Sequence, residues 1–61
     1  MTESYKVFEY VRKDYSITVW RLGEADDEPG NYYVETTGGP ALSPEQFAVM
    51  AKRVAEDAKQ K

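Results

Sequence analysis

The densest cluster of side chains that could take part in chemistry is a group of carboxylates. Glu24, Asp26, Asp27 and Glu28 all lie within the segment EADDEP, and carboxylate oxygens are the ligands that calcium and magnesium prefer in proteins. The segment lacks the alternating oxygen ligands and the central glycine of a calcium loop. A solvated acidic loop is therefore the better interpretation, and we expect neither a metal nor a cofactor.

Catalytic chemistry has few other candidates. The chain contains no histidine and no cysteine, which removes the commonest general base and the thiol nucleophile. Glu9 is the one acid expected among apolar neighbours, and the glycines of TTGGP are not followed by the lysine of a phosphate loop. Sixty-one residues also leave little room to enclose a small-molecule substrate. We therefore expect a protein that is not an enzyme and has no catalytic residues.

The clearest structural element is a helix at residues 44–60. Ser43 is a suitable N-cap, Pro44 takes the first helical position, and Gln46 follows three residues after the cap. Apolar residues recur at steps of three and four, which predicts one buried stripe with charged residues on the opposite side. The stripe comprises Phe47, Met50, Ala51, Val54, Ala55 and Ala58, and the charged side comprises Lys52, Arg53, Glu56, Asp57 and Lys59.

Three segments upstream are typical of β-strands, because they are rich in β-branched and aromatic residues. They span residues 5–11, 16–22 and 31–37. Polar or glycine-bounded segments, RKDY and GEADDEPG, separate them. The order predicts one small α+β domain over residues 1–61, in which a three-stranded antiparallel meander packs against one C-terminal helix (βββα).

The loop between the first two strands decides which side chains share a face, since a shift of one residue turns a strand's side chains to the other side. An even loop places Phe8 opposite Val19, but Lys6 then faces Arg21. An odd loop avoids that like-charge pair and separates aliphatic from aromatic side chains, so we favour it. The odd loop gathers Val7, Val11, Ile17 and Val19 on one side, and Phe8, Tyr10, Trp20 and Leu22 with Lys6 and Arg12 on the other.

Either register leaves large apolar groups on both faces of the sheet, whereas one helix with a partly alanine stripe covers only one face. An exposed aromatic surface is unusual on a monomer that has no binding role. We therefore expect a partner-binding surface with aromatic anchors and a basic rim, comprising Phe8, Tyr10, Trp20, Tyr33, Lys6 and Arg12. The alternative is that the aromatics are ordinary core residues and that the loop GGPAL, with Leu42, folds under the sheet.

The expected function is that of a small protein-binding module, an accessory or inhibitory factor of the kind that phages and mobile elements encode. Its partner would be another protein or a second copy of the chain, and the acidic loop would steer a basic partner. The alternative is a nucleic-acid-binding domain that uses the three-stranded sheet.

Two families show similar features. The layout of three strands and a helix resembles AP2-type and integrase arm-binding domains, which would imply DNA binding, but strands two and three here contain only Arg21 as a basic residue. The serine and tryptophan of SITVW and the later PG are similar to those of MbtH-like activators of adenylation enzymes, although the further tryptophans of that family are missing. The second resemblance would imply an accessory role.

No segment approaches the roughly 20 apolar residues of a membrane span, and MTESYK lacks the basic and then apolar layout of a signal peptide. A chain without cysteine suits a reducing compartment. We therefore expect a soluble, cytoplasmic protein with no membrane partner.

Overall fold

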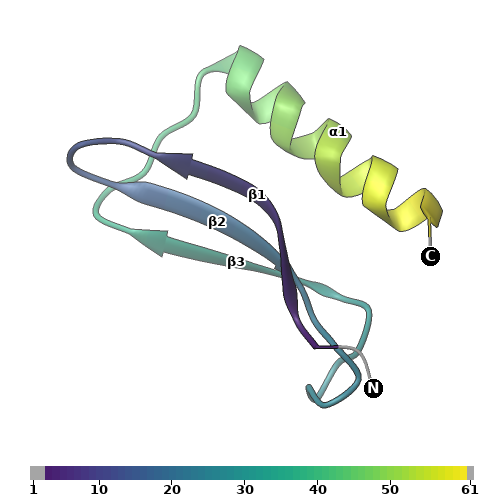
Figure 1. The fold of residues 1–61 in the computed structure, drawn as a ribbon. Helices are drawn as coiled ribbons and strands as arrows, with labels where there is room; N and C mark the ends of the chain where they lie inside the picture. The colour runs from purple at the N-terminus through teal and green to yellow at the C-terminus, as the bar shows by residue number, and fades with distance from the viewer. Residues whose placement is uncertain (1–2, 61) are drawn as a thin grey trace.

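The computed structural model describes residues 3–60 and has the predicted order of elements. Strands β1 (Tyr5–Val11), β2 (Ser16–Arg21) and β3 (Tyr32–Thr37) form one antiparallel sheet in the order β1-β2-β3. The helix α1 (Pro44–Gln60) follows and lies along the β1 side of the sheet (Figure 1). The βββα fold is therefore confirmed, with every boundary within one residue of the predicted one. Within this described part of the chain, no helix is long and apolar enough to cross a membrane.

The β1–β2 hairpin has the even loop, so the odd-loop register favoured from the sequence is wrong. Phe8 pairs with Val19 and Tyr10 with Ile17 across a turn at residues 12–15. These side chains consequently share one face of the sheet. Phe8 and Tyr10 therefore join the aliphatic residues instead of facing away from them.

A β-bulge at Val7 removes the objection to the even loop. The register shifts between Lys6 and Phe8, so that Lys6 lies opposite Trp20, and Tyr5 takes the place opposite Arg21. The like-charge pair that counted against this register never forms. A single inserted residue in β1 thus makes the observed pairing electrostatically acceptable.

The strand pairings give the sheet two faces with different compositions. The helix face, which α1 covers in part, presents Tyr5, Phe8, Tyr10, Ile17, Val19, Arg21, Tyr32, Val34 and Thr36. The open face presents Lys6, Glu9, Val11, Ser16, Thr18, Trp20, Tyr33, Glu35 and Thr37.

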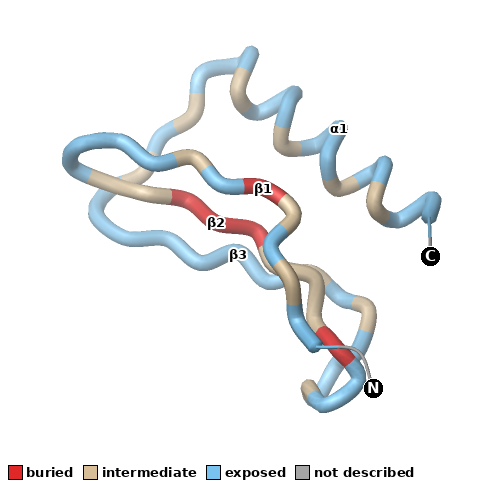
Figure 2. The backbone as a smooth tube through the Cα atoms, viewed as in Figure 1, coloured by how far each residue is buried: buried red, intermediate tan, exposed pale blue. Residues whose placement is uncertain are grey.

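The apolar core is thin. Among residues 3–60 the buried apolar side chains are Phe8, Ile17 and Val19, which lie on the helix face of β1 and β2. Figure 2 shows buried stretches, in red, on both of these strands. No residue of α1 is fully buried. The accessible surface of 4614 Å² exceeds the roughly 4,000 Å² expected for a compact protein of 7.0 kDa. Stability must therefore depend on a small number of contacts outside the core.

The helix begins as predicted, but the side that it turns to the sheet shares only Met50 and Val54 with the predicted stripe. Ser43 Oγ accepts a hydrogen bond from the backbone N–H of Gln46 at 3.2 Å, as an N-cap does. Phe47, expected in the buried stripe, is 58% exposed. The half-buried residues of α1 are Gln46, Met50, Val54 and Asp57. The reason is that Asp57, expected on the charged side, is hydrogen-bonded to residues of the sheet.

Candidate interaction surface

The open face carries an aromatic depression. Trp20 and Tyr33 are direct cross-strand neighbours on β2 and β3, so their side chains emerge next to each other. The indole N–H of Trp20 donates to Glu35 Oε1 at 3.3 Å, and Lys6 Nζ lies 5.7 Å from the centre of a Trp20 ring. The depression has a volume of about 260 Å³ and is lined by Ser4, Trp20, Leu22, Tyr33 and Glu35. Such a site suits an apolar or aromatic side chain with a polar end.

The charges around this depression are few and partly paired. Lys6 Nζ lies 3.3 Å from Glu9 Oε2, an exposed ion pair of the kind that contributes little to stability. The strands bring one lysine and two glutamates to the open face, which gives a net charge of −1. Surfaces that bind nucleic acid neutralise several phosphates with lysine and arginine. The open face is therefore better suited to protein side chains than to a phosphate backbone.

The predicted binding residues do not form one surface. Phe8 is 6% exposed and belongs to the core. Tyr10 lies on the helix face, where its ring centre is 6.3 Å from that of Tyr15 and 5.6 Å from the guanidinium carbon of Arg12 at the hairpin turn. The hydroxyl of Tyr15 donates to the carbonyl of Ala41, so the loop before α1 contacts this turn. The predicted residues that meet on the open face are Lys6, Trp20 and Tyr33.

A polar cluster on the helix face was missed by sequence reasoning. Asp57 of α1 accepts hydrogen bonds from the hydroxyl of Tyr5 at 2.6 Å, from the hydroxyl of Tyr32, and from the Arg21 guanidinium at 3.1 Å. The Arg21 and Asp57 side chains are only 18% and 13% exposed. The backbone of α1 packs only against β1 among the described strands. The cluster therefore adds hydrogen bonds from α1 to Arg21 of β2 and to Tyr32 of β3.

The protonation states of this cluster are fixed by its hydrogen bonds. Donation by Tyr32 and by Tyr5, together with Arg21, lowers the pKa of Asp57 below its ordinary value. The bond to Asp57 raises the pKa of Tyr5, while burial and then the same carboxylate raise the pKa of Tyr32. At neutral pH the carboxylate is ionised and both phenols are protonated. The hydrogen bonds of the cluster therefore join α1 to the sheet through an ionised carboxylate.

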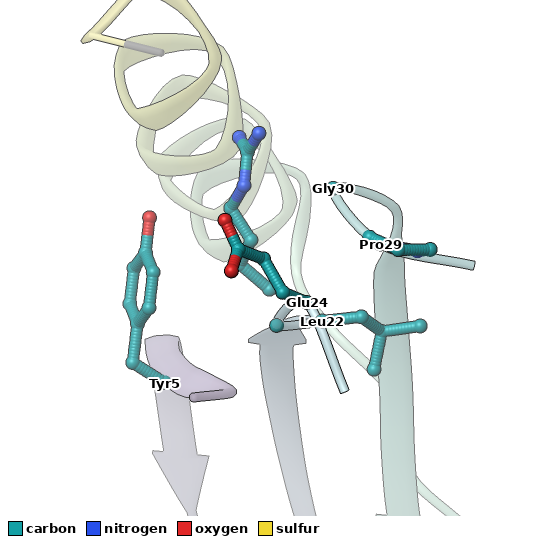
Figure 3. A pocket seen from close by; sticks show the side chains of 7 residues that line it. Tyr5, Leu22, Glu24, Pro29 and Gly30 are labelled. Carbon is teal, nitrogen blue, oxygen red and sulfur yellow. The ribbon is translucent and has the colours of Figure 1, made fainter. Parts of the chain in front are cut away.

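A second depression lies beside this cluster. Its volume is about 170 Å³, and its lining residues are Tyr5, Arg21, Leu22, Gly23, Glu24, Pro29 and Gly30. Figure 3 shows the side chains of Tyr5 and Glu24 extending toward α1. The guanidinium of Arg21 is already bonded to Asp57 and Tyr32. Within residues 3–60 no group of three acidic side chains is arranged to hold a metal ion. The open face is consequently the stronger candidate for recognition.

No family model, curated protein or solved structure matches this chain. Neither the layout shared with AP2-type and integrase arm-binding domains nor the residues shared with MbtH-like activators is therefore accompanied by a detectable relationship.

One carboxylate of the acidic loop has a structural role. Asp26 Oδ2 accepts hydrogen bonds from the backbone N–H of Gly23 at 2.7 Å and from Ser4 Oγ at 2.6 Å. The Asp26 N–H in turn donates to the carbonyl of Gly23 at 3.1 Å. The loop between β2 and β3 is thus tied to the chain that precedes β1. Glu24, Asp27 and Glu28 are exposed and available to a partner.

We expect Asp26→Ala to lower the free energy of unfolding by about 1–2 kcal/mol, because two donors lose their acceptor. The matched variant Asp27→Ala, at an exposed neighbouring position, should change it by less than about 0.5 kcal/mol. Urea denaturation followed by circular dichroism measures both. Equal unfolding midpoints for the two variants would show that Asp26 does not organise the loop.

Proposed function

We propose that the protein is a small non-enzymatic protein-binding module, an accessory or inhibitory factor that docks a larger cytoplasmic protein on its open face. The observation that carries this proposal is the Trp20–Tyr33 depression on a sheet face that no described helix or strand covers. Tryptophan and tyrosine are enriched among the residues that dominate binding energy at interfaces. Tyr33 is 54% exposed and Val11, on the same face, is 64% exposed.

The size of the molecule is compatible with this function. Its two longer dimensions are 35 and 22 Å, so one broad side offers an area close to the roughly 800 Å² that each partner contributes to a standard interface. The thin core adds a reason for binding, since a partner would remove exposed apolar surface from water. A docked partner would therefore stabilise the fold.

The acidic loop gives the partner a charge preference. Residues 23–30 follow Leu22, which comes directly after β2 and lines the depression. Four carboxylates in this loop contribute −4 to a chain whose formal charge is −3. Complementary charge accelerates association and excludes partners of the same sign. We therefore expect the partner to present a basic rim around an apolar contact.

Site-specific photocrosslinking tests the proposed surface. A benzophenone amino acid placed at Tyr33 in the native host is expected to give a covalent adduct with a larger protein. The same group placed at Lys52, an exposed position on α1, is the matched control and should give no such adduct. Adducts of equal yield at both positions, or none at Tyr33, would contradict the proposal.

Replacement of Trp20 separates recognition from folding. Once the crosslinked protein is purified, Trp20→Ala is expected to weaken its binding by about 30-fold or more, the effect of removing a central anchor. Circular dichroism shows whether the variant keeps its fold. A folded Trp20→Ala protein with unchanged affinity would exclude this surface, and binding of an oligonucleotide with steep salt dependence would favour the nucleic-acid alternative.

A further inference from the structure

The two edges of the sheet differ in how they are protected. The β1 edge carries the bulge at Val7 and lies under α1. The β3 edge has a regular register with β2 over all six paired residues, contains no proline or lysine, and has no described helix against it. Edge strands of soluble proteins are usually blunted by such features, because their free N–H and C=O groups pair readily with another strand.

The hydrogen-bonding pattern shows which groups of β3 are free. The N–H of Leu22 donates to the carbonyl of Asn31 at 2.8 Å. Since hydrogen-bonded pairs alternate along an antiparallel ladder, Tyr33, Glu35 and Thr37 of β3 bond to β2. The backbone groups that point away from the sheet are therefore those of Tyr32, Val34 and Thr36.

We propose that β3 pairs antiparallel with the β3 of a second copy, about a two-fold axis that passes through Val34. The result is a continuous six-stranded sheet. In this register Val34 lies opposite Val34 of the second copy, Tyr32 lies opposite its Thr36, and Tyr33 lies opposite its Glu35. This interface uses the edge of the sheet and does not rest on the function proposed for the open face.

Overlap and charge together select this register. Antiparallel strands related by a two-fold axis place the residue at the axis opposite itself. Axes at Val34 and at Glu35 both let five residues of each β3 overlap, whereas axes farther along the strand pair fewer. An axis at Glu35 would place two carboxylates directly opposite each other, which is destabilising. The axis at Val34 instead pairs each Glu35 with a tyrosine.

Pairing of the two β3 strands would also bury side chains that are exposed in the single chain. Val34 is 51% exposed and Tyr33 54% exposed, and the two side chains point to opposite faces of the sheet. Pairing covers Val34 with its equivalent on the helix face and forms about six backbone hydrogen bonds. Such a contact lies below the roughly 1,600 Å² of a standard interface, so we expect a dissociation constant in the micromolar range.

Charge-swap variants at the axis test this inference. Wild-type protein is expected to show a monomer–dimer equilibrium in analytical ultracentrifugation at concentrations up to about 500 µM. Val34→Lys and Val34→Glu should each remain monomeric, because like charges meet at the axis. An equimolar mixture of the two variants should form a heterodimer. Val11→Lys, at an exposed valine away from β3, is the control and should dimerise as the wild type does.

Each alternative result overturns the proposal. A wild type that stays monomeric, a Val34→Lys variant that dimerises normally, or a mixture that does not associate is incompatible with the axis at Val34. Thr36→Pro provides an independent measurement, since it removes an outward N–H without breaking the ladder to β2. It should be folded and monomeric, and a folded dimer would count against pairing through β3.

The two proposals fail independently. In the photocrosslinking experiment at Tyr33, a product with twice the mass of the chain identifies the dimer. An adduct with a larger protein identifies the partner of the open face. If the wild type remains monomeric but the probe at Tyr33 still gives an adduct with a larger protein, only the dimer proposal is excluded.

Discussion

Gly38→Ala is expected to lower the free energy of unfolding by about 3–4 kcal/mol, a large part of the roughly 3–9 kcal/mol available to a domain of this length. Gly38 has a φ of 74°, where an alanine costs about 1–2 kcal/mol. An added Cβ would lie 2.4 Å from the carbonyl oxygen of Asp14 and 2.9 Å from Cβ of Tyr15. The backbone of the β1–β2 turn would have to move, because neither neighbour is the end of a flexible side chain.

The adjacent glycine is a matched control. A Cβ at Gly39 would meet no atom within 4 Å, so Gly39→Ala should leave stability nearly unchanged or raise it slightly by restricting the unfolded chain. Urea denaturation of the two variants measures the difference. Similar midpoints for both would mean that Gly38 does not fix the end of β3 against the β1–β2 turn.

The parts of the fold that follow from local sequence were predictable. The cap at Ser43 and the proline after it fix the start of α1, and the β-branched and aromatic segments fix the strands. These signals act over a few residues, so they can be recognised without knowledge of the rest of the chain. The meander order then follows because short loops join neighbouring elements.

The candidate surface was less predictable, because it depends on the bulge at Val7. No glycine or proline marks that position, and one extra residue changes the face on which the preceding side chains lie. The bulge explains why Phe8 is a core residue while Lys6 stands next to Trp20. A pattern of alternating residues cannot reveal this shift until the pairing with β2 is known.

The orientation of α1 was unpredictable for a different reason. The apolar periodicity of a helix ranks residues by hydrophobicity, and it therefore places Asp57 on the solvent side. In the structure Asp57 bonds to Tyr5 and Tyr32, which are 52 and 25 residues away in sequence. Such long-range polar contacts leave no local pattern, although they decide which side of α1 meets the sheet.

The two proposed surfaces reinforce each other. Because the two-fold axis is perpendicular to the sheet, the open faces of the proposed dimer lie on the same side. Two Trp20–Tyr33 depressions would then be presented together, with Tyr33 of each copy beside Glu35 of the other. A partner that also forms dimers would bind such an assembly more tightly than it binds one copy, since the second contact becomes intramolecular.

Asp57→Asn is expected to lower the free energy of unfolding by about 1–3 kcal/mol, because the three groups that donate to the carboxylate lose a charged acceptor. Asp57 accepts the hydrogen bonds that join α1 to Arg21 of β2 and to Tyr32 of β3, so the helix should also become more mobile without it. Glu56→Gln removes the same charge from the neighbouring exposed position and should have little effect. Thermal unfolding followed by circular dichroism compares the two variants.

The same cluster predicts how stability depends on pH. The folded pKa of Asp57 lies below its unfolded value of 3.8, so its contribution is complete above that pH and is lost as the pH falls through the folded value. The folded pKa values of Tyr5 and Tyr32 lie above 10.0, so their contributions are complete below pH 10 and are lost as the pH rises through the folded values. Asp57→Asn should therefore weaken both the acid and the alkaline dependence of the unfolding midpoint. If the variant and the wild type show parallel pH profiles, the cluster does not hold α1 to the sheet.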